Sequence, residues 1–123
     1  MIKYVSTTIV TDAAGDATVY VGGALRGRVI AIKYAPGTIA TGADLTISGE
    51  ITGVPILVKA NAGTSTVWFY PVAQLNLNTD GSAIDYNHMY INLVDERVKV
   101  VVAQGGDTKT GTITVYWETS EAL

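Results

Sequence analysis

The chain has 123 residues, no cysteine and a formal net charge of −3 at pH 7. This length suits a single domain with its own core, and the lack of cysteine excludes a disulfide framework, a thiolate nucleophile and a zinc–thiolate site. The acidic balance disfavours general binding to nucleic acid or to an anionic membrane surface, because both attract basic proteins.

The first half of the sequence alternates short β-forming runs with turn residues. Asp12 to Asp16, Gly22-Gly23 and the Pro36-Gly37 pair supply the turns, since these residue types favour turn conformations or cannot donate to a ladder. We predict strands over residues 2–10, 17–21, 28–34 and 44–51.

The second half is less regular. Residues 55–60 and 66–70 are predicted strands, whereas residues 72–88 favour an extended loop with a turn at Asp80-Gly81. Residues 89–94 resume as a strand, and Asp95-Glu96 is interpreted as a tight connection into the last element. The tail, residues 120–123, is expected to be frayed.

Residues 96–118 carry the clearest pattern. Two runs alternate with period two around Gly105-Gly106 and Gly111, which predicts an antiparallel β-hairpin. The inward side chains of this hairpin are predicted to be Val98, Val100, Val102, Ile113, Val115 and Trp117.

The fold class follows from the number and spacing of these runs. No segment has a helical period, and eight or nine short strands predict an all-β single domain over residues 1–123. The architecture is either an antiparallel, jelly-roll-like β-sandwich or a partly closed barrel. Residues 1–10 are a candidate N-terminal arm or edge strand, and we expect neither a signal peptide nor a membrane span.

The sequence offers no catalytic, metal-binding or cofactor-binding constellation. His88 is the only histidine, and no Ser–His–Asp set can be named with it. The Gly-rich stretch 105–111 lacks the GK[ST] of a phosphate-binding loop. Most acids, such as Asp12 and Asp80, lie in turns, where their side chains bind local backbone.

The remaining polar and aromatic residues are candidates for interfaces. Charged residues make up only 15% of the chain, which fits either a core diluted by Thr, Ser and Gly or a surface partly buried against partners. Arg97 and Lys99 could pair with Glu118 across the hairpin or meet an acidic partner. The candidate interface residues are Tyr4, His88, Arg97, Lys99 and Tyr116.

Four segments together resemble a known family: VIAIKYAPG, ATGADLTISGEITG, TVWFYPV and DERVKVVVAQGGDTKTGTITVYWE. They are similar to small all-β structural proteins of tailed-bacteriophage virions, of the head decoration or cement type. The resemblance covers roughly residues 29–118 and rests on strand and turn patterns.

The resemblance implies a function as well as a fold. It implies a non-enzymatic protein without cofactors, made in the bacterial cytoplasm, located on the capsid surface and bound to the major capsid protein. It also implies self-association, as homotrimers. A head–tail connector or tail component, and a carbohydrate-binding β-sandwich module, are the alternatives.

Overall fold

The computed structural model describes residues 1–119, so the expected frayed tail at 120–123 lies outside the described residues. These residues form nine strands, all paired antiparallel, which confirms the all-β prediction. Within residues 1–119 there is no helix long and apolar enough to cross a membrane. The strands are β1 (Ile2–Val10), β2 (Ala17–Ala35), β3 (Asp44–Gly49), β4 (Pro55–Lys59), β5 (Val67–Phe69), β6 (Val72–Asn76), β7 (Ala83–Tyr90), β8 (Asn92–Ala103) and β9 (Thr110–Glu118).

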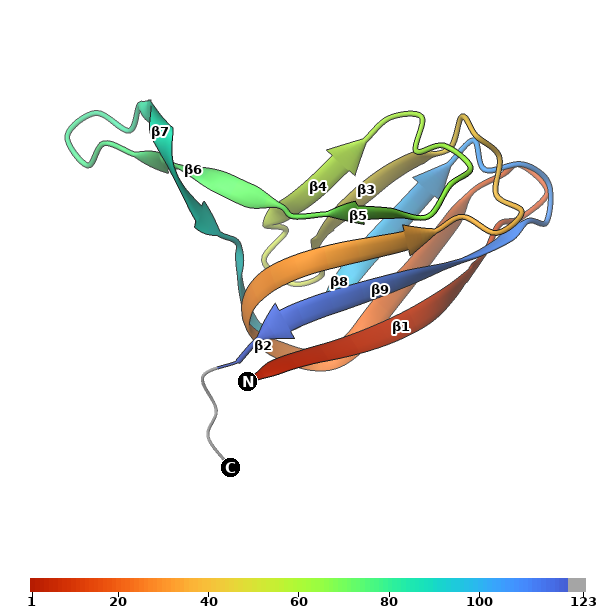
Figure 1. The fold of residues 1–123 in the computed structure, drawn as a ribbon, viewed down its shortest axis with the longest axis horizontal. Helices are drawn as coiled ribbons and strands as arrows, with labels where there is room; N and C mark the ends of the chain where they lie inside the picture. The colour runs from red at the N-terminus through yellow and green to blue at the C-terminus, as the bar shows by residue number, and fades with distance from the viewer. Residues whose placement is uncertain (120–123) are drawn as a thin grey trace.

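Seven strands form one sheet that folds over on itself. The order is β1-β9-β2-β8-β3-β4, and β5 also pairs with β2. Figure 1 shows β1, β9, the second half of β2 and β5 in front of β4, β3, β8 and the first half of β2. The result is a β-sandwich in which β2 contributes to both layers.

Strand β2 bends where it passes between the layers. Its first half pairs with β8 and its second half with β9, with register shifts on either side of Leu25. Gly22 lies there with φ 81° and Gly27 with φ 118°, conformations that L side chains rarely adopt. We predicted separate strands at 17–21 and 28–34, but the glycines bend one strand and do not end it.

The predicted inner faces of the last two strands are confirmed, but their pairing was predicted wrongly. Strand β8 pairs with β2 and β3, and β9 pairs with β1 and β2; no ladder joins β8 to β9 within residues 1–119. Their connection crosses between layers, with Gln104 and Thr108 at positive φ. Alternation specifies faces and leaves the neighbouring strand open. The buried side chains are Val98, Val100, Val102, Ile113, Val115 and Trp117.

Strand β1 forms the end of the sheet. Its register with β9 is unbroken from Ile2 opposite Glu118 to Val10 opposite Thr110. Residues 1–10, which we predicted to be an N-terminal arm or an edge strand, therefore include an edge strand of the chain's own sheet.

The segment predicted as an extended loop, residues 72–88, contains a second sheet. Strands β6 and β7 pair with each other and project away from the sandwich (Figure 1). The predicted turn is present between them, because Gly81 N donates to Leu77 O and Ser82 N donates to the Asp80 carboxylate. The turn residues were read correctly, but the strands on either side were missed because their apolar residues face solvent.

Glu96 is a buried carboxylate beside the bend of β2. Its side chain is 2% exposed, and Leu25 is its partner in the β2–β8 ladder. It accepts hydrogen bonds from Ile51 N and Thr52 N, both at 3.0 Å, and from the Thr52 hydroxyl. We predicted a connection at Asp95-Glu96, but β8 runs through it, and Asp95 takes φ 63°.

The surroundings of Glu96 favour its charged form. Burial raises the pKa of this carboxyl, but the hydrogen bonds from Thr52, Ile51 and Val94 outweigh burial and hold the pKa below its ordinary value of 4.5. The carboxylate thus fixes the β3–β4 turn against β8.

We expect Glu96→Gln to lower the free energy of unfolding by about 2 kcal/mol near pH 7, because an amide nitrogen would face N–H donors. The folded pKa lies below the unfolded one, so the contribution of this charge is complete above pH 4.5 and is lost as pH falls through the folded pKa. Urea unfolding near pH 7, and again at a pH below the folded pKa of Glu96, checks this. The exposed Asp107→Asn is the control. Equal stability of Glu96→Gln and wild type near pH 7 would contradict it.

Tyr34 gives a second stability test. The side chain is fully buried, and its hydroxyl has no hydrogen-bond partner within residues 1–119. Burial raises the pKa of this phenol. We expect Tyr34→Phe to leave the free energy of unfolding unchanged or to raise it by up to about 1 kcal/mol, because a desolvated polar group is removed. A loss of stability in urea unfolding would count against this.

Candidate functional site

An aromatic row crosses the outer face of the layer that contains β1, β9 and β5. Tyr4 and Tyr116 are register partners, and their ring centroids are 5.6 Å apart. Trp68 lies 5.1 Å from Tyr116, and the Lys33 ammonium lies 5.4 Å from the Trp68 ring. Tyr4 is 69% exposed and Trp68 43%. The structure therefore brings two candidate interface residues together.

The row follows from strand alternation and from one small residue. Val115 points into the core, so Tyr116 points outward. Ala31 on β2 is the ladder partner of Tyr116 and is only 4% exposed. Its small side chain leaves room for Trp68 to reach Tyr116 from the far side of β2. The sequence indicated Tyr116 but not Trp68, because the pairing of β5 with β2 is not encoded in either strand alone.

Arg97 and Lys99 lie on the other layer. The Arg97 Nε donates to Glu50 at 2.8 Å, a second nitrogen also contacts Glu50, and the guanidinium lies 4.2 Å from the Tyr20 ring. Tyr20 is also the ladder partner of Lys99. We predicted that Arg97 and Lys99 lie on one hairpin with Tyr116, and offered Glu118 as an ion-pair partner across it. The pairing of β8 with β2 and β3 separates these residues and gives Arg97 a different carboxylate.

The ion pair between Arg97 and Glu50 shifts both titrations in the expected directions. The hydrogen bond from Arg97 lowers the pKa of Glu50, and the hydrogen bond to Glu50 raises the pKa of Arg97. Both side chains are partly solvent-exposed, so the pair adds little to stability. With its charge matched inside the chain, Arg97 is less available to an acidic partner.

His88 lies on β7, in ladder register with Gln74. It lines an open hollow of about 320 Å³ together with Arg28, Met89, Tyr90 and Asn92. Within residues 1–119, no three His, Cys, Asp or Glu side chains gather to hold a metal ion.

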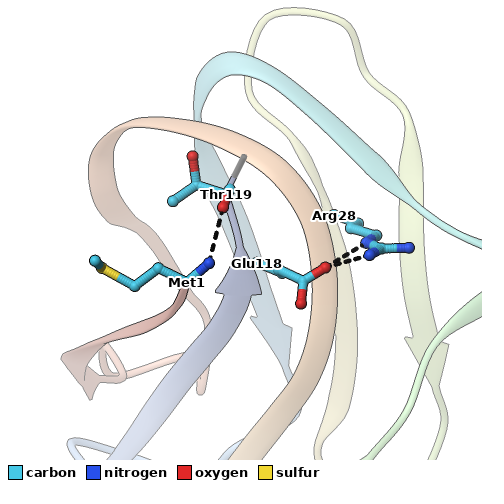
Figure 2. Close-up of polar contacts among 4 residues, drawn as sticks. All are labelled: Met1, Arg28, Glu118 and Thr119. Atoms are coloured by element: carbon cyan, nitrogen blue, oxygen red, sulfur yellow. Dashed lines mark hydrogen bonds and ion pairs between the residues drawn. The ribbon is translucent and has the colours of Figure 1, made fainter. Parts of the chain in front are cut away.

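Arg28 lies at the base of the β6–β7 hairpin. Its Nε donates to Glu118 at 2.8 Å, and its guanidinium lies 5.4 Å from the Tyr90 ring (Figure 2 shows the contact with Glu118). It is the ladder partner of both Asn92 and Glu118, one on each side of β2. Arg28 therefore links the base of the hairpin to both layers.

Turn acids behave as the sequence indicated. The Asp12 carboxylate accepts bonds from Ala14 N and Asp16 N, both at 2.9 Å, whereas Asp44 lies at the start of β3 and accepts a bond from the more distant Asn61 N. A bond from Ser82 N lowers the pKa of Asp80. These contacts account for Asp12, Asp44 and Asp80 as structural groups.

The β6–β7 hairpin carries a surface that the sequence analysis missed. Both faces expose apolar or aromatic side chains, and Tyr86 is 90% exposed. At its base, a groove of about 390 Å³ lies between Val54, Pro55 and the hairpin. One signal was available: no Lys or Arg occurs between Lys59 and Arg97. The exposed large apolar residues of the hairpin and its turn are Val72, Leu77, Tyr86, Met89 and Tyr90.

The chain matches no known family but has a distant structural neighbour. No protein-family model and no curated protein matches the chain. Among solved structures, the chain is similar to an exo-β-1,3-galactanase from Phanerochaete chrysosporium, crystallised with galactose, at 11% identity and a TM-score of 0.37. The match covers 92% of this chain and 27% of that one.

We expect the two tyrosines of the aromatic row to be energetically coupled. A double-mutant cycle of Tyr4→Ala and Tyr116→Ala, measured by urea unfolding, should give about 0.5–1.5 kcal/mol of coupling from the ring contact. Tyr4→Ala combined with Tyr86→Ala is the control, because Tyr86 lies on the hairpin and the two effects should add. Additive effects in the first cycle would contradict the contact.

Proposed function

We propose that this chain is a non-enzymatic structural protein of a tailed-bacteriophage virion. It binds the capsid surface and stabilises the shell by bridging neighbouring major capsid subunits. The resemblance of residues 29–118 to decoration proteins suggests this class of protein. The exposed β6–β7 hairpin is the observation that supports bridging between capsid subunits.

The hairpin supports bridging because it extends beyond the core that holds the rest of the chain. An isolated two-stranded hairpin is marginally stable in water. Here its apolar side chains lie on exposed strands that project from the sandwich (Figure 1). A partner surface that covered Tyr86 and Met89 would stabilise it. One major capsid subunit could then bind the sandwich while the neighbouring capsid subunit binds the hairpin.

Bridging by many copies gives a physical route to shell stabilisation. Each contact can be modest, because opening one capsid subunit would require several contacts to break together. Binding only to the assembled shell shifts its equilibrium toward the assembled form by mass action.

Two alternative functions, a head–tail connector or tail component and a carbohydrate-binding module, predict different observations. A head–tail connector or tail component would use the same hairpin but occur in a few copies per particle, so the copy number distinguishes it from a decoration protein. A carbohydrate-binding module would need free aromatic faces. In the aromatic row, Tyr116 packs between Tyr4 and Trp68, which covers part of each ring. The aromatic row therefore gives less support to sugar stacking than to a protein contact, and the more exposed Tyr86 lies on the hairpin that we assign to the capsid contact.

We expect removal of the hairpin to abolish capsid binding while the sandwich stays folded. Val72 and Tyr90 are ladder partners, so an Asn-Gly turn can replace residues 73–89. Wild-type protein should bind expanded capsids assembled from the major capsid protein of the same genome and raise their disruption temperature. The shortened chain should keep cooperative unfolding and lose both effects.

A point variant separates surface chemistry from the loss of a segment. Tyr86→Ser should weaken capsid binding roughly tenfold or more if Tyr86 anchors the contact. Val58→Ser, at an exposed site on β4, should bind as wild type does. Failure of wild-type protein to bind these capsids, or full binding by the shortened chain, would overturn the proposal.

A further inference from the structure

The outer edge of β1 carries a row of backbone groups that β9 does not use. Met1 N donates to Thr119 O and Thr119 N donates to Met1 O, both at 3.0 Å (Figure 2 shows the first bond). Hydrogen-bonded and non-hydrogen-bonded pairs alternate along an antiparallel ladder. Odd-numbered residues of β1 therefore bond to β9, and even-numbered ones direct N–H and C=O outward. The outward residues are Ile2, Tyr4, Ser6, Thr8 and Val10.

This edge lacks the features that usually prevent strands from pairing with other chains. Proteins blunt exposed edges with short strands, prolines, bulges and charges. Strand β4 begins at Pro55 and has a register shift, and β5 has three residues and is soon followed by Pro71. Strand β1 has nine residues, no proline, no register shift and a single charge, Lys3. The outer edge of β1 is therefore available to pair with a strand of another chain.

The side chains of β1 suit a second copy of the same strand. Pairing two β1 strands antiparallel about Ser6 places Ile2 opposite Val10 of the partner, so that side chains 60% and 54% exposed meet. It places Tyr4 opposite Thr8, and every outward N–H and C=O meets a counterpart, because all paired positions are even-numbered. The Lys3 side chains lie far apart, at opposite ends of the pair. Apolar and aromatic–Thr pairs are favourable across strands.

We propose that two copies of this chain associate through the outer edges of β1, antiparallel, with the two-fold axis at Ser6. The outer layers of the two sandwiches then form one continuous sheet, and the pairing is isologous. This inference does not rest on the capsid function, because it involves β1 and not the hairpin. It also differs from the trimer that the family resemblance implies.

Single cysteines test both the dimer and its register. The chain has no cysteine, so one introduced thiol can form a disulfide only with another copy. In a hydrogen-bonded antiparallel pair the Cα atoms lie about 5.5 Å apart, within the range for a disulfide. Ser6→Cys faces itself across the proposed axis. Thr8→Cys is equally outward but faces Tyr4 of the partner.

We expect Ser6→Cys to form a disulfide-linked dimer under mild oxidation roughly tenfold or more faster than Thr8→Cys, because pairing raises the effective thiol concentration. Wild-type protein should show a concentration-dependent dimer mass in sedimentation, and Thr8→Pro should shift it to monomer, because proline removes an outward N–H. A wild-type monomer at all concentrations, a trimer mass, or equal cross-linking of the two cysteine variants would overturn the proposal. Loss of capsid binding alone would leave the dimer intact, so the two proposals fail separately.

Discussion

The passage of β2 from one layer to the other is the constraint on which the rest of the structure depends. One strand must pair with β8 over its first half and with β9 over its second, and it turns through register shifts around Leu25. Gly27 allows the close approach, since a Cβ there would collide with the carbonyl of Glu118. Glu96, opposite Leu25, uses its buried charge to hold the β3–β4 turn beside this bend. The two layers are therefore joined by one continuous strand, and the buried carboxylate fixes the β3–β4 turn against β8 within one of them.

A fold organised around β2 leaves two uncovered features in different places. The β6–β7 hairpin branches off after β5 and returns at β8, so it lies outside the core and exposes Tyr86. Strand β1 closes the sheet at the far end and has no neighbour beyond it within residues 1–119. Our two proposals assign these features to different partners, β1 to a second copy of the chain and the hairpin to the capsid surface. That arrangement suits a subunit of an assembly, and low charge density is consistent with it.

The sequence correctly predicted features that depend on one strand alone, such as which side chains face inward. It did not predict which strands pair with each other. Alternation correctly placed Val100 and Trp117 inward, because face is a local property. It could not show that β8 and β9 lie in different layers, since either pairing buries the same side chains. Gly22-Gly23 was interpreted as a break because glycine permits both a turn and a bulge. Tyr4 and Tyr116 were candidates individually, and only the β1–β9 register makes them a single surface.

Native-state amide hydrogen exchange tests the central role of β2 most directly. If one bent strand holds both layers, the paired amides of its two halves should open with the same free energy, together with those of β8, and should be the slowest to exchange. The β6–β7 amides should exchange far faster. Two distinct opening free energies on either side of Gly22-Gly23 would contradict this account, because the layers would then unfold as independent units.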